Sequence, residues 1–271
     1  MEEKFLTREI VQQNGWDELE VITADMLDGY TEIGYAAFGN CYNITSITIP
    51  NSVTYIGNSA FAGCDSLTSV IVPNSVITIG ASAFRGCSNL KSINIPDSTK
   101  EIGEYAFHRC KSLTSITIPD SVTRMESGAF DGCSSLTSVT IPNSVTYMGY
   151  WVFNHCSFKT PKRYDEQGRL IAYKGFNADM SCRGFQYEEG ETYEMDGEIK
   201  LCERGFHACT NPLDCLNFYG GEICKDVVYH EVYLEDVSDE SGDDSKVVAR
   251  KITIGHEITL SEMADIASGK K

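Results

Sequence analysis

Hydrophobic and polar positions alternate in a repeating pattern along residues 33–157, with a constant step of 23 residues. Residues 112–119, SLTSITIP, show the most regular part of each repeat. Ile116 and Ile118 alternate with Thr117, so a strand places both isoleucines on one face. A proline follows at Pro119, where the missing N–H ends strand pairing. Each repeat is therefore predicted to be one coil with an inward-facing apolar strand and a turn.

Six cysteines recur at the same step, whereas the five later cysteines have no period. The regular set is Cys41, Cys64, Cys87, Cys110, Cys133 and Cys156. A period of this length with a leucine and isoleucine skeleton is typical of a β-rich leucine-rich-repeat solenoid. A column of identical small thiols is expected to be buried and reduced, because free Cys packs as a compact hydrophobe.

Two further columns of small residues accompany the strands. The hydroxyls of Ser52, Ser75, Ser98, Ser121 and Ser144 are predicted to satisfy backbone groups of neighbouring coils. The glycines at 34, 57, 80, 103 and 149 are predicted to adopt a backbone shape closed to other residues. Glu126 takes the glycine position in one repeat, so that coil is expected to be strained or reshaped.

The repeat has different sequences on either side. Residues 1–32 are predicted to cap the solenoid, with a helix around 7–13 that ends at Asn14-Gly15. Residues 158–169 are predicted to be a linker, and 170–271 a small α+β domain. Its expected strands are 170–174, 205–208, 227–234 and 246–254, with a helix over 212–218 that Asn211 caps.

The net charge of the chain limits the kinds of partner that it is expected to bind. The chain has 22 Lys and Arg against 39 Asp and Glu, a formal net charge of −17, which argues against direct nucleic-acid binding. No apolar run approaches the ~18 residues of a membrane span, and acids stand where a signal peptide has basic residues. We therefore expect no membrane insertion and a cytoplasmic location in a bacterial or phage-infected cell. The oligomeric state is left open.

The string IGEYAFHRCKSLTSITIPDSVTR at 102–124 resembles the BspA-type leucine-rich repeats of bacterial and protist proteins. The resemblance covers 33–157 and implies a right-handed solenoid that binds proteins or host surfaces. Aromatic and Arg side chains at variable outward positions are favoured in such contacts. The flat Ser/Thr face of the strands is a second candidate surface. Any solvated sheet of this repeat also has such a Ser/Thr face. The predicted partner-binding residues are Tyr55, Thr48, Ile71, Asn94, Arg124, Thr117, Thr140 and Tyr147.

The strings AYKGFNADMSCRGFQYEEGETY and LCERGFHACTNPLDCLNFY resemble an uncharacterised domain of phage and bacterial proteins. GFHACTNPLDCLNFYG is also similar to a core segment of PARP-like ADP-ribosyltransferases. That similarity implies NAD as substrate, with Lys174 on the ribose or phosphate and His207 and Tyr219 lining the nicotinamide. The acid that stabilises the oxocarbenium-like sugar is then Asp244, with Glu231 and Glu257 as other candidates.

Each of these residues has a simpler interpretation. His207 between Phe206 and Ala208 is typical of a half-buried structural histidine. Cys202, His207, Cys209 and Cys215 lack paired C-x-x-C spacing, so no zinc site is predicted, and the acidic run 235–244 lacks the calcium-loop pattern. The sequence favours a non-enzymatic protein-binding role without a cofactor, plausible for an inhibitor of a host protein. The alternative is an ADP-ribosyltransferase-like domain that the solenoid targets.

Overall fold

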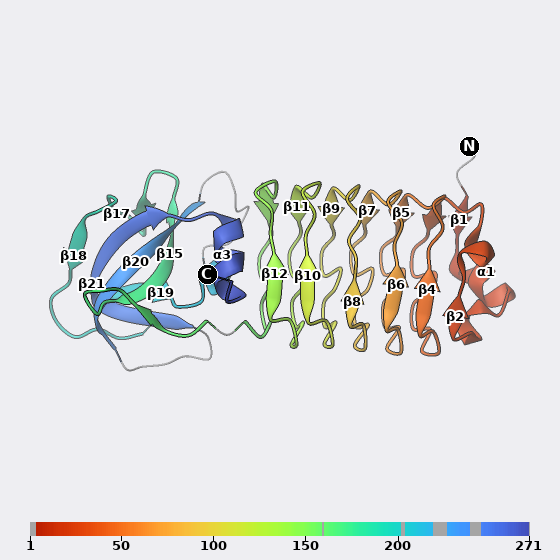
Figure 1. Cartoon of the computed structure of the whole chain (residues 1–271), viewed down its shortest axis with the longest axis horizontal. Helices are drawn as coiled ribbons and strands as arrows, with labels where there is room; N and C mark the ends of the chain where they lie inside the picture. Colours follow the sequence, from red (N-terminus) through yellow and green to blue (C-terminus); the bar gives the residue numbers. More distant parts are fainter. Residues whose placement is uncertain (1–3, 159, 202–203, 219–226, 239–244, 271) are drawn as a thin grey trace. The chain divides into compact units, whose positions relative to one another are not determined.

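The computed structural model describes residues 4–158, 160–201, 204–218, 227–238 and 245–270. The chain divides into two compact units, Met1–Ser157 and Phe158–Lys271. The first is a β-rich solenoid of about six coils and the second is a small α+β unit (Figure 1). The predicted fold class is confirmed.

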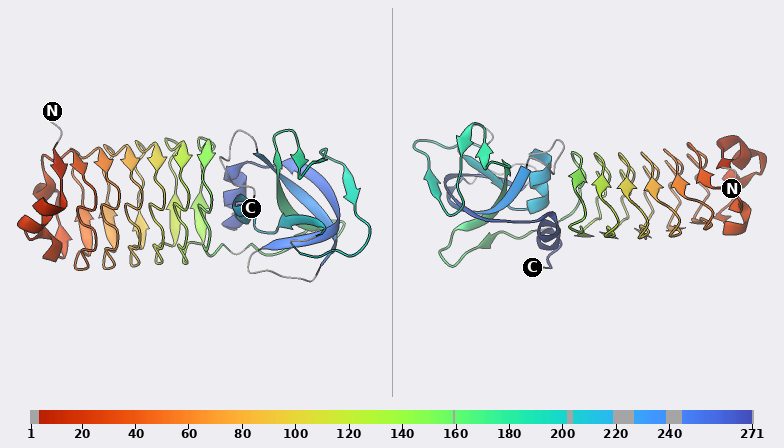
Figure 2. Two further views of the ribbon diagram at one scale, coloured as in Figure 1. Left: turned by 180° about the vertical axis from the view of Figure 1, so that it is seen from behind. Right: turned by 90° about the horizontal axis from the view of Figure 1, so that it is seen from above.

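Parallel strands from successive coils form two series in the N-terminal unit. One is a seven-stranded sheet of β1 (Phe5–Leu6), β3 (Glu32–Ile33), β5 (Tyr55–Ile56), β7 (Thr78–Ile79), β9 (Glu101–Ile102), β11 (Arg124–Met125) and β13 (Tyr147–Met148). The other comprises β2 (Val21–Ile22), β4 (Ser46–Thr48), β6 (Ser69–Ile71) and β8 (Ser92–Ile93), then the pair β10 (Ser115–Thr117) and β12 (Ser138–Thr140). Each coil supplies one strand to each series, except the last, whose described strand β13 belongs to the first series (Figure 2).

Identical buried side chains stack from coil to coil between the sheets. The rings of Phe38, Phe61, Phe84, Phe107, Phe130 and Phe153 lie nearly parallel, with successive centroids 5.1–5.5 Å apart. In the cysteine column each thiol from Cys64 to Cys156 donates to the carbonyl of the Phe 26 residues earlier, at 3.0–3.4 Å. The thiols therefore act as small hydrophobes that also donate one weak hydrogen bond.

Four of the five serines behave as predicted, whereas the hydroxyl of Ser52 is buried without a hydrogen-bond partner, and the glycine column does not behave as predicted. Ser75, Ser98, Ser121 and Ser144 donate to carbonyls of the preceding coil at 2.6–3.0 Å. The glycines have no positive φ, so the expected special backbone shape is wrong. A Cβ added at Gly57 would instead lie 2.6 Å from the Ile33 carbonyl oxygen. Glycine is needed there because adjacent coils approach closely.

Glu126 fits at the glycine position without the expected backbone strain, since its φ is not positive. Its N–H donates to the Ile102 carbonyl at 2.9 Å, the bond that Gly103 makes to Ile79 one coil earlier. Its carboxylate accepts two hydrogen bonds from Arg124. Positive φ occurs elsewhere, for example at Ser82 (56°) and Tyr105 (54°).

The N-terminal segment adds one strand to each series and closes the end of the core. Thr7 caps α1 (Arg8–Gln13), and Gly15 follows it with a φ of 67°. η1 (Trp16–Glu18) and η2 (Ala24–Leu27) flank β2. Nη1 of Arg8 donates to the Gly39 carbonyl at 2.8 Å and lies 3.1 Å from the sulfur of Cys41. The thiol of Cys41 therefore contacts Arg8 of the N-terminal cap, whereas the later thiols contact the preceding coil.

The C-terminal unit is built on a closed ring of four antiparallel strands. β15 (Leu170–Asn177) pairs with β20 (Val227–Val237), β20 with β21 (Lys246–Glu257), β21 with β19 (Phe206–Cys209), and β19 again with β15. Shorter strands β14 (Arg163–Tyr164) and β18 (Thr192–Glu194) join β15 and β21, while β16 (Ser181–Cys182) and β17 (Phe185–Gln186) form a hairpin. The four predicted strands are present: β15, β20 and β21 are longer than predicted, and β19 is shifted by one residue.

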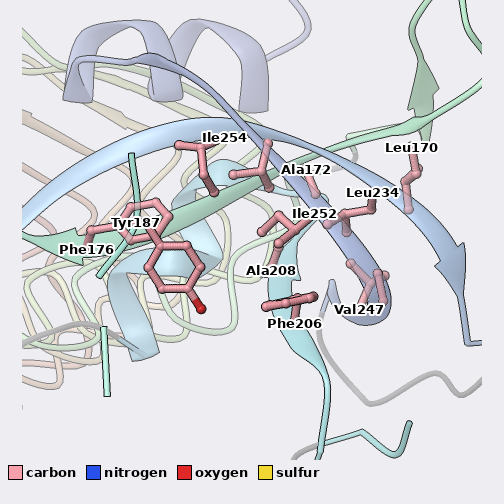
Figure 3. Close-up of a cluster of buried hydrophobic side chains, with 12 residues drawn as sticks. Leu170, Ala172, Phe176, Tyr187, Phe206, Ala208, Leu234, Val247, Ile252 and Ile254 are labelled. Carbon is pink, nitrogen blue, oxygen red and sulfur yellow. The ribbon is translucent and has the colours of Figure 1, made fainter. Parts of the chain in front are cut away.

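The interior of this ring is the core of the unit. Its side chains come from β15, β19, β20, β21 and the segment around Tyr187, and they point toward one another (Figure 3). The predicted helix is present as η3 (Pro212–Asp214) followed by α2 (Cys215–Phe218), with the Asn211 side chain accepting from the Leu213 N–H. The sequence analysis missed α3 (Leu260–Ala267), which packs on η3. The expected linker 158–169 contains β14 and falls within this unit.

Candidate functional site

Two features are candidates for function, a ladder of side chains on the solenoid and a pocket in the C-terminal unit. The first-sheet ladder consists of residues in register across the seven-stranded sheet: Phe5, Glu32, Tyr55, Thr78, Glu101, Arg124 and Tyr147. Every one of them is at least partly exposed. The ladder therefore presents aromatic, acidic and basic groups side by side on one sheet.

Arg124 and Tyr147 are held in place by one another. The Arg124 guanidinium lies 3.9 Å from the centre of the Tyr147 ring, and its Nη2 donates to Oε1 of Glu126 at 2.7 Å. At Tyr55, burial and the nearby carboxylates of Glu32 and Glu101 raise the pKa of the phenol, so the hydroxyl stays protonated at neutral pH. The ladder thus offers ordered hydrogen-bond donors and flat ring surfaces.

The other predicted contact residues lie on the second series of strands. Thr48, Ile71, Thr117 and Thr140 end β4, β6, β10 and β12, and Asn94 follows β8. All five are at least partly exposed, and Ile71 is 62 % exposed. The eight predicted residues are therefore divided between two sheets and do not form one column.

The pocket of the C-terminal unit lies between β15 and β19, where the ring of strands is held by the fewest residue pairs. β15 and β19 are in register at a single described pair, Tyr173 and Cys209, and diverge beyond it. The cavity between them measures about 480 Å³ and is lined by residues 174–177, 181–183, 187, 205–209, 227 and 246. We call it the basic pocket, because Lys174, Arg183 and Lys246 line it and none of its described lining residues is acidic.

Lys174 crosses the opening between the two strands. Its Nζ donates to the His207 carbonyl at 3.2 Å and lies 5.5 Å from the centre of the Phe176 ring. The side chain is only 5 % exposed, and burial lowers the pKa of its ammonium, an effect that the nearby Cys182 thiol opposes. A cation in this position favours a compensating negative charge.

The transferase similarity implies that Lys174 and His207 lie close together. In the structure, Lys174 contacts the backbone carbonyl of His207. Phe206 and Ala208 belong to the interior cluster, so strand alternation turns the imidazole away from that cluster, while His207 still lines the cavity. Burial, followed by the charges of Lys174, Arg183 and Lys246, lowers the pKa of His207. The imidazole is therefore mainly neutral at pH 7.

The remaining predicted catalytic residues are not brought to the basic pocket by the described structure. Tyr219 and Asp244 lie outside the described residues. Glu231 pairs with Arg163 at 3.5 Å, and neither Glu231 nor Glu257 lines the cavity. Within the described ranges, no three His, Cys, Asp or Glu side chains gather closely enough to hold a metal ion.

Sequence reasoning missed the residues that complete the basic pocket. Arg183 occupies the two-residue turn between β16 and β17, where it and Gly184 both have positive φ, as a type I′ hairpin requires. Lys246 begins β21 opposite Cys209. The ring of Tyr187 packs edge-to-face against the ring of Phe176, with the ring centroids 5.2 Å apart. Only strand pairing brings these segments together, although the RG pair at 183–184 is a signal for the hairpin.

The solenoid defines the class of protein to which this chain is similar. Residues 31–160 match the BspA type leucine rich repeat region in six copies, and residues 170–266 match a domain of unknown function, DUF7666. The chain therefore contains a BspA-type leucine-rich-repeat region followed by a DUF7666 domain. Solenoids of this type are commonly protein-interaction or surface proteins.

Two solved structures illustrate the likeness of the repeat region. A leucine-rich repeat protein of T. pallidum is 33% identical, with 48% of this chain and 62% of that chain covered and a TM-score of 0.46. One from Bacteroides ovatus is 32% identical, with 50% and 47% covered and a TM-score of 0.39. The chain thus spans less than two thirds of the length of these relatives. The comparison with curated proteins finds no match.

No helix in the part of the chain that the structure describes has the length and apolar character needed to cross a membrane.

Proposed function

We propose that this chain is a protein-interaction protein whose solenoid binds a partner protein without chemical turnover. The observation that carries the proposal is the first-sheet ladder, in which variable aromatic and charged residues stand beside the recurring Ile and Met residues of the core. Tyr and Arg dominate the energetics of many protein interfaces because they bury large, rigid surfaces and still donate hydrogen bonds. Tyr55, Arg124 and Tyr147 supply these groups.

Preorganisation strengthens this assignment. Arg124 is already fixed by Glu126 and by the Tyr147 ring, so little side-chain entropy is lost when a partner covers it. The uniform threonines of the second series, with Ile71 and Asn94, form an additional contact surface. Net negative charge favours a partner with a basic face, because complementary charge speeds association.

The experiment compares the full chain with a Tyr55→Ser, Arg124→Ala, Tyr147→Ser variant as bait in bacterial lysate. A Tyr42→Ser, Lys111→Ala variant, altered at exposed solenoid positions outside the ladder, is the control. We expect the same captured protein with the wild-type and control baits, and at least tenfold less with the ladder variant. Equal capture by all three baits would exclude the ladder as the contact surface.

The more specific proposal is that the partner is a host protein that the chain inhibits in the cytoplasm of a bacterial or phage-infected cell. The resemblance of the C-terminal domain to phage and bacterial modules supports it. We expect that expression of the full chain slows bacterial growth and that the ladder variant does not. Equal growth inhibition by both proteins would contradict an inhibitory role for the ladder.

A second candidate function is an ADP-ribosyltransferase-like activity of the C-terminal unit. It is supported by the position of Lys174 and His207 together at the basic pocket. The test is nicotinamide release from NAD by the full chain, beside a Lys174→Ala, His207→Ala double variant. Release that disappears in the variant would establish an enzyme, and no release from the wild type with or without lysate would reject this candidate.

A further inference from the structure

The charge of the basic pocket is opposite to that of the protein. The chain has 17 more acidic than basic residues, yet the described wall of this cavity holds two lysines, one arginine and no carboxylate. Acidic residues are numerous in the same unit, for example in the segment Glu188, Glu189 and Glu191, but they lie outside the pocket. Such a separation concentrates positive potential in one concave site.

The cations come from three different parts of the fold. Lys174 projects from the interior face of β15, Arg183 lies on the β16–β17 hairpin, and Lys246 begins β21. All three side chains line the same cavity, together with His207. Positive charges that line one concave site favour the binding of an anionic ligand there.

The rest of the wall contains three aromatic side chains beside the polar residues Asn177, Ser181 and His207. Phe176, Tyr187 and Phe206 line the same cavity and belong to the interior cluster of the unit (Figure 3). The volume of about 480 Å³ falls within the ~300–1,000 Å³ that is typical of pockets for organic ligands. A lone inorganic anion needs neither this volume nor aromatic walls.

We propose that the basic pocket binds a small phosphorylated molecule that carries a planar ring, of the chemical class of a nucleotide. Its phosphate lies among Lys174, Arg183 and Lys246, and its ring lies against the aromatic wall. This binding role is separate from the solenoid interaction and requires no bond to be broken.

The experiment is titration calorimetry of the full chain with ADP, AMP, adenosine and inorganic phosphate at constant ionic strength. We expect ADP to bind more tightly than either adenosine or phosphate alone, since only ADP fills both parts of the pocket. The variants are Arg183→Gln and Lys246→Gln, whose side chains are not buried. Each is expected to weaken ADP binding about tenfold, because a charge-assisted hydrogen bond is lost.

Lys162→Gln is the matched control, because it removes one positive charge from an exposed position of the same unit outside the basic pocket. It is expected to change ADP affinity less than twofold. Failure of both ADP and AMP to bind at about 1 mM, the weak end of ligand affinity, would overturn the proposal. Equal weakening by Lys162→Gln and Lys246→Gln would also overturn it, since binding would then reflect overall charge.

A second measurement reports on the site directly. NMR titration of the His207 imidazole is expected to show a higher pKa when ADP is bound, because the phosphate offsets the three cations. An unchanged His207 pKa with ADP bound would place the nucleotide elsewhere. Binding of ADP without nicotinamide release from NAD separates this proposal from the transferase candidate, and loss of ADP binding leaves the solenoid proposal untouched.

Discussion

At the scale of single residues, the cysteine column shows how one small side chain can serve two purposes. From Cys64 onward, each thiol fills the space between coils and donates to a Phe carbonyl of the preceding coil, which also accepts a backbone N–H within its own coil. Burial raises the pKa of Cys64 and Cys133 to about 12, and that of Cys87 and Cys110 well above the ordinary value. The thiolate, which is the reactive form, is therefore suppressed in the folded protein.

We predict that iodoacetamide at pH 8 labels Cys182, which is partly exposed in the basic pocket, and leaves Cys64, Cys87, Cys110 and Cys133 unlabelled. At this pH a pKa of about 12 leaves only about one thiol in 10⁴ ionised, and burial blocks access to it. Peptide mass spectrometry gives the labelled positions, and the urea-unfolded chain is the control. Labelling of Cys64 at the rate of Cys182 would contradict the burial of the column.

The same pKa shifts predict how stability depends on pH. The unfolded thiols ionise near 9.0 while those of the folded solenoid remain protonated to about 12, so the unfolded state binds fewer protons in this window. The contribution of these thiols to the free energy of unfolding should therefore be constant below pH 9 and fall between pH 9 and 12. Urea unfolding monitored by circular dichroism measures this. A Cys110→Ala variant should show a smaller fall.

At the scale of elements, the coils approach closely because both strand series are parallel and in register. The glycine column allows this approach: a Cβ at Gly103 would lie 2.6 Å from the backbone nitrogen of Ala81. The phenylalanine stack then fills the interior at a matching spacing of 5.1–5.5 Å. The spacing of the coils is thus set jointly by backbone pairing and by the side chains on each side of it.

We predict that Gly103→Ala destabilises the solenoid by about 1–3 kcal/mol, because the added methyl group meets backbone atoms that cannot rotate away. Gly168→Ala is the control: no atom lies within 4 Å of its added Cβ, and only its positive φ opposes the change. That control should cost about 1 kcal/mol. Urea unfolding measures both, and a smaller effect at Gly103 than at Gly168 would show that the coils can separate at little cost.

At the scale of the whole molecule, the chain contains two hydrophobic cores made of different residues. Phe84 is fully buried in the stack of the solenoid, and Ile252 is fully buried inside the ring of the C-terminal unit. Each unit satisfies its own strand pairing, since the described registers join strands within one unit. The first-sheet ladder and the basic pocket therefore depend on separate cores.

We predict that Phe84→Ala and Ile252→Ala have effects confined to their own units. Each leaves a cavity that costs about 2–5 kcal/mol. Hydrogen exchange should accelerate only within Met1–Ser157 for the first variant and only within Phe158–Lys271 for the second. The exchange pattern of each variant is the control for the other. Faster exchange in both units for either single variant would show that the two cores unfold together.

The solenoid could be predicted in detail because its information is local and repeated. The alternation around Ile116 and the recurring Phe, Cys and Leu define the same inward face in every coil. The reason for the glycine column could not be predicted, because the sequence does not show how closely one coil approaches the next. The core strands of the C-terminal unit were also predictable from their apolar runs, whereas β14 and α3 lie in polar or mixed segments and depend on tertiary pairing and packing.

The sequence by itself determined that residues 33–157 form a repeating β-solenoid and which side chains face inward, because a 23-residue period repeats the same local preferences. The family resemblance also predicted that Lys174 and His207 belong to one candidate NAD site. Only the tertiary structure decided that Lys174 is buried at an opening between β15 and β19, with Arg183 and Lys246 nearby. The physical reason is that a closed ring of strands joins segments far apart in the chain, and no local pattern encodes which strands meet.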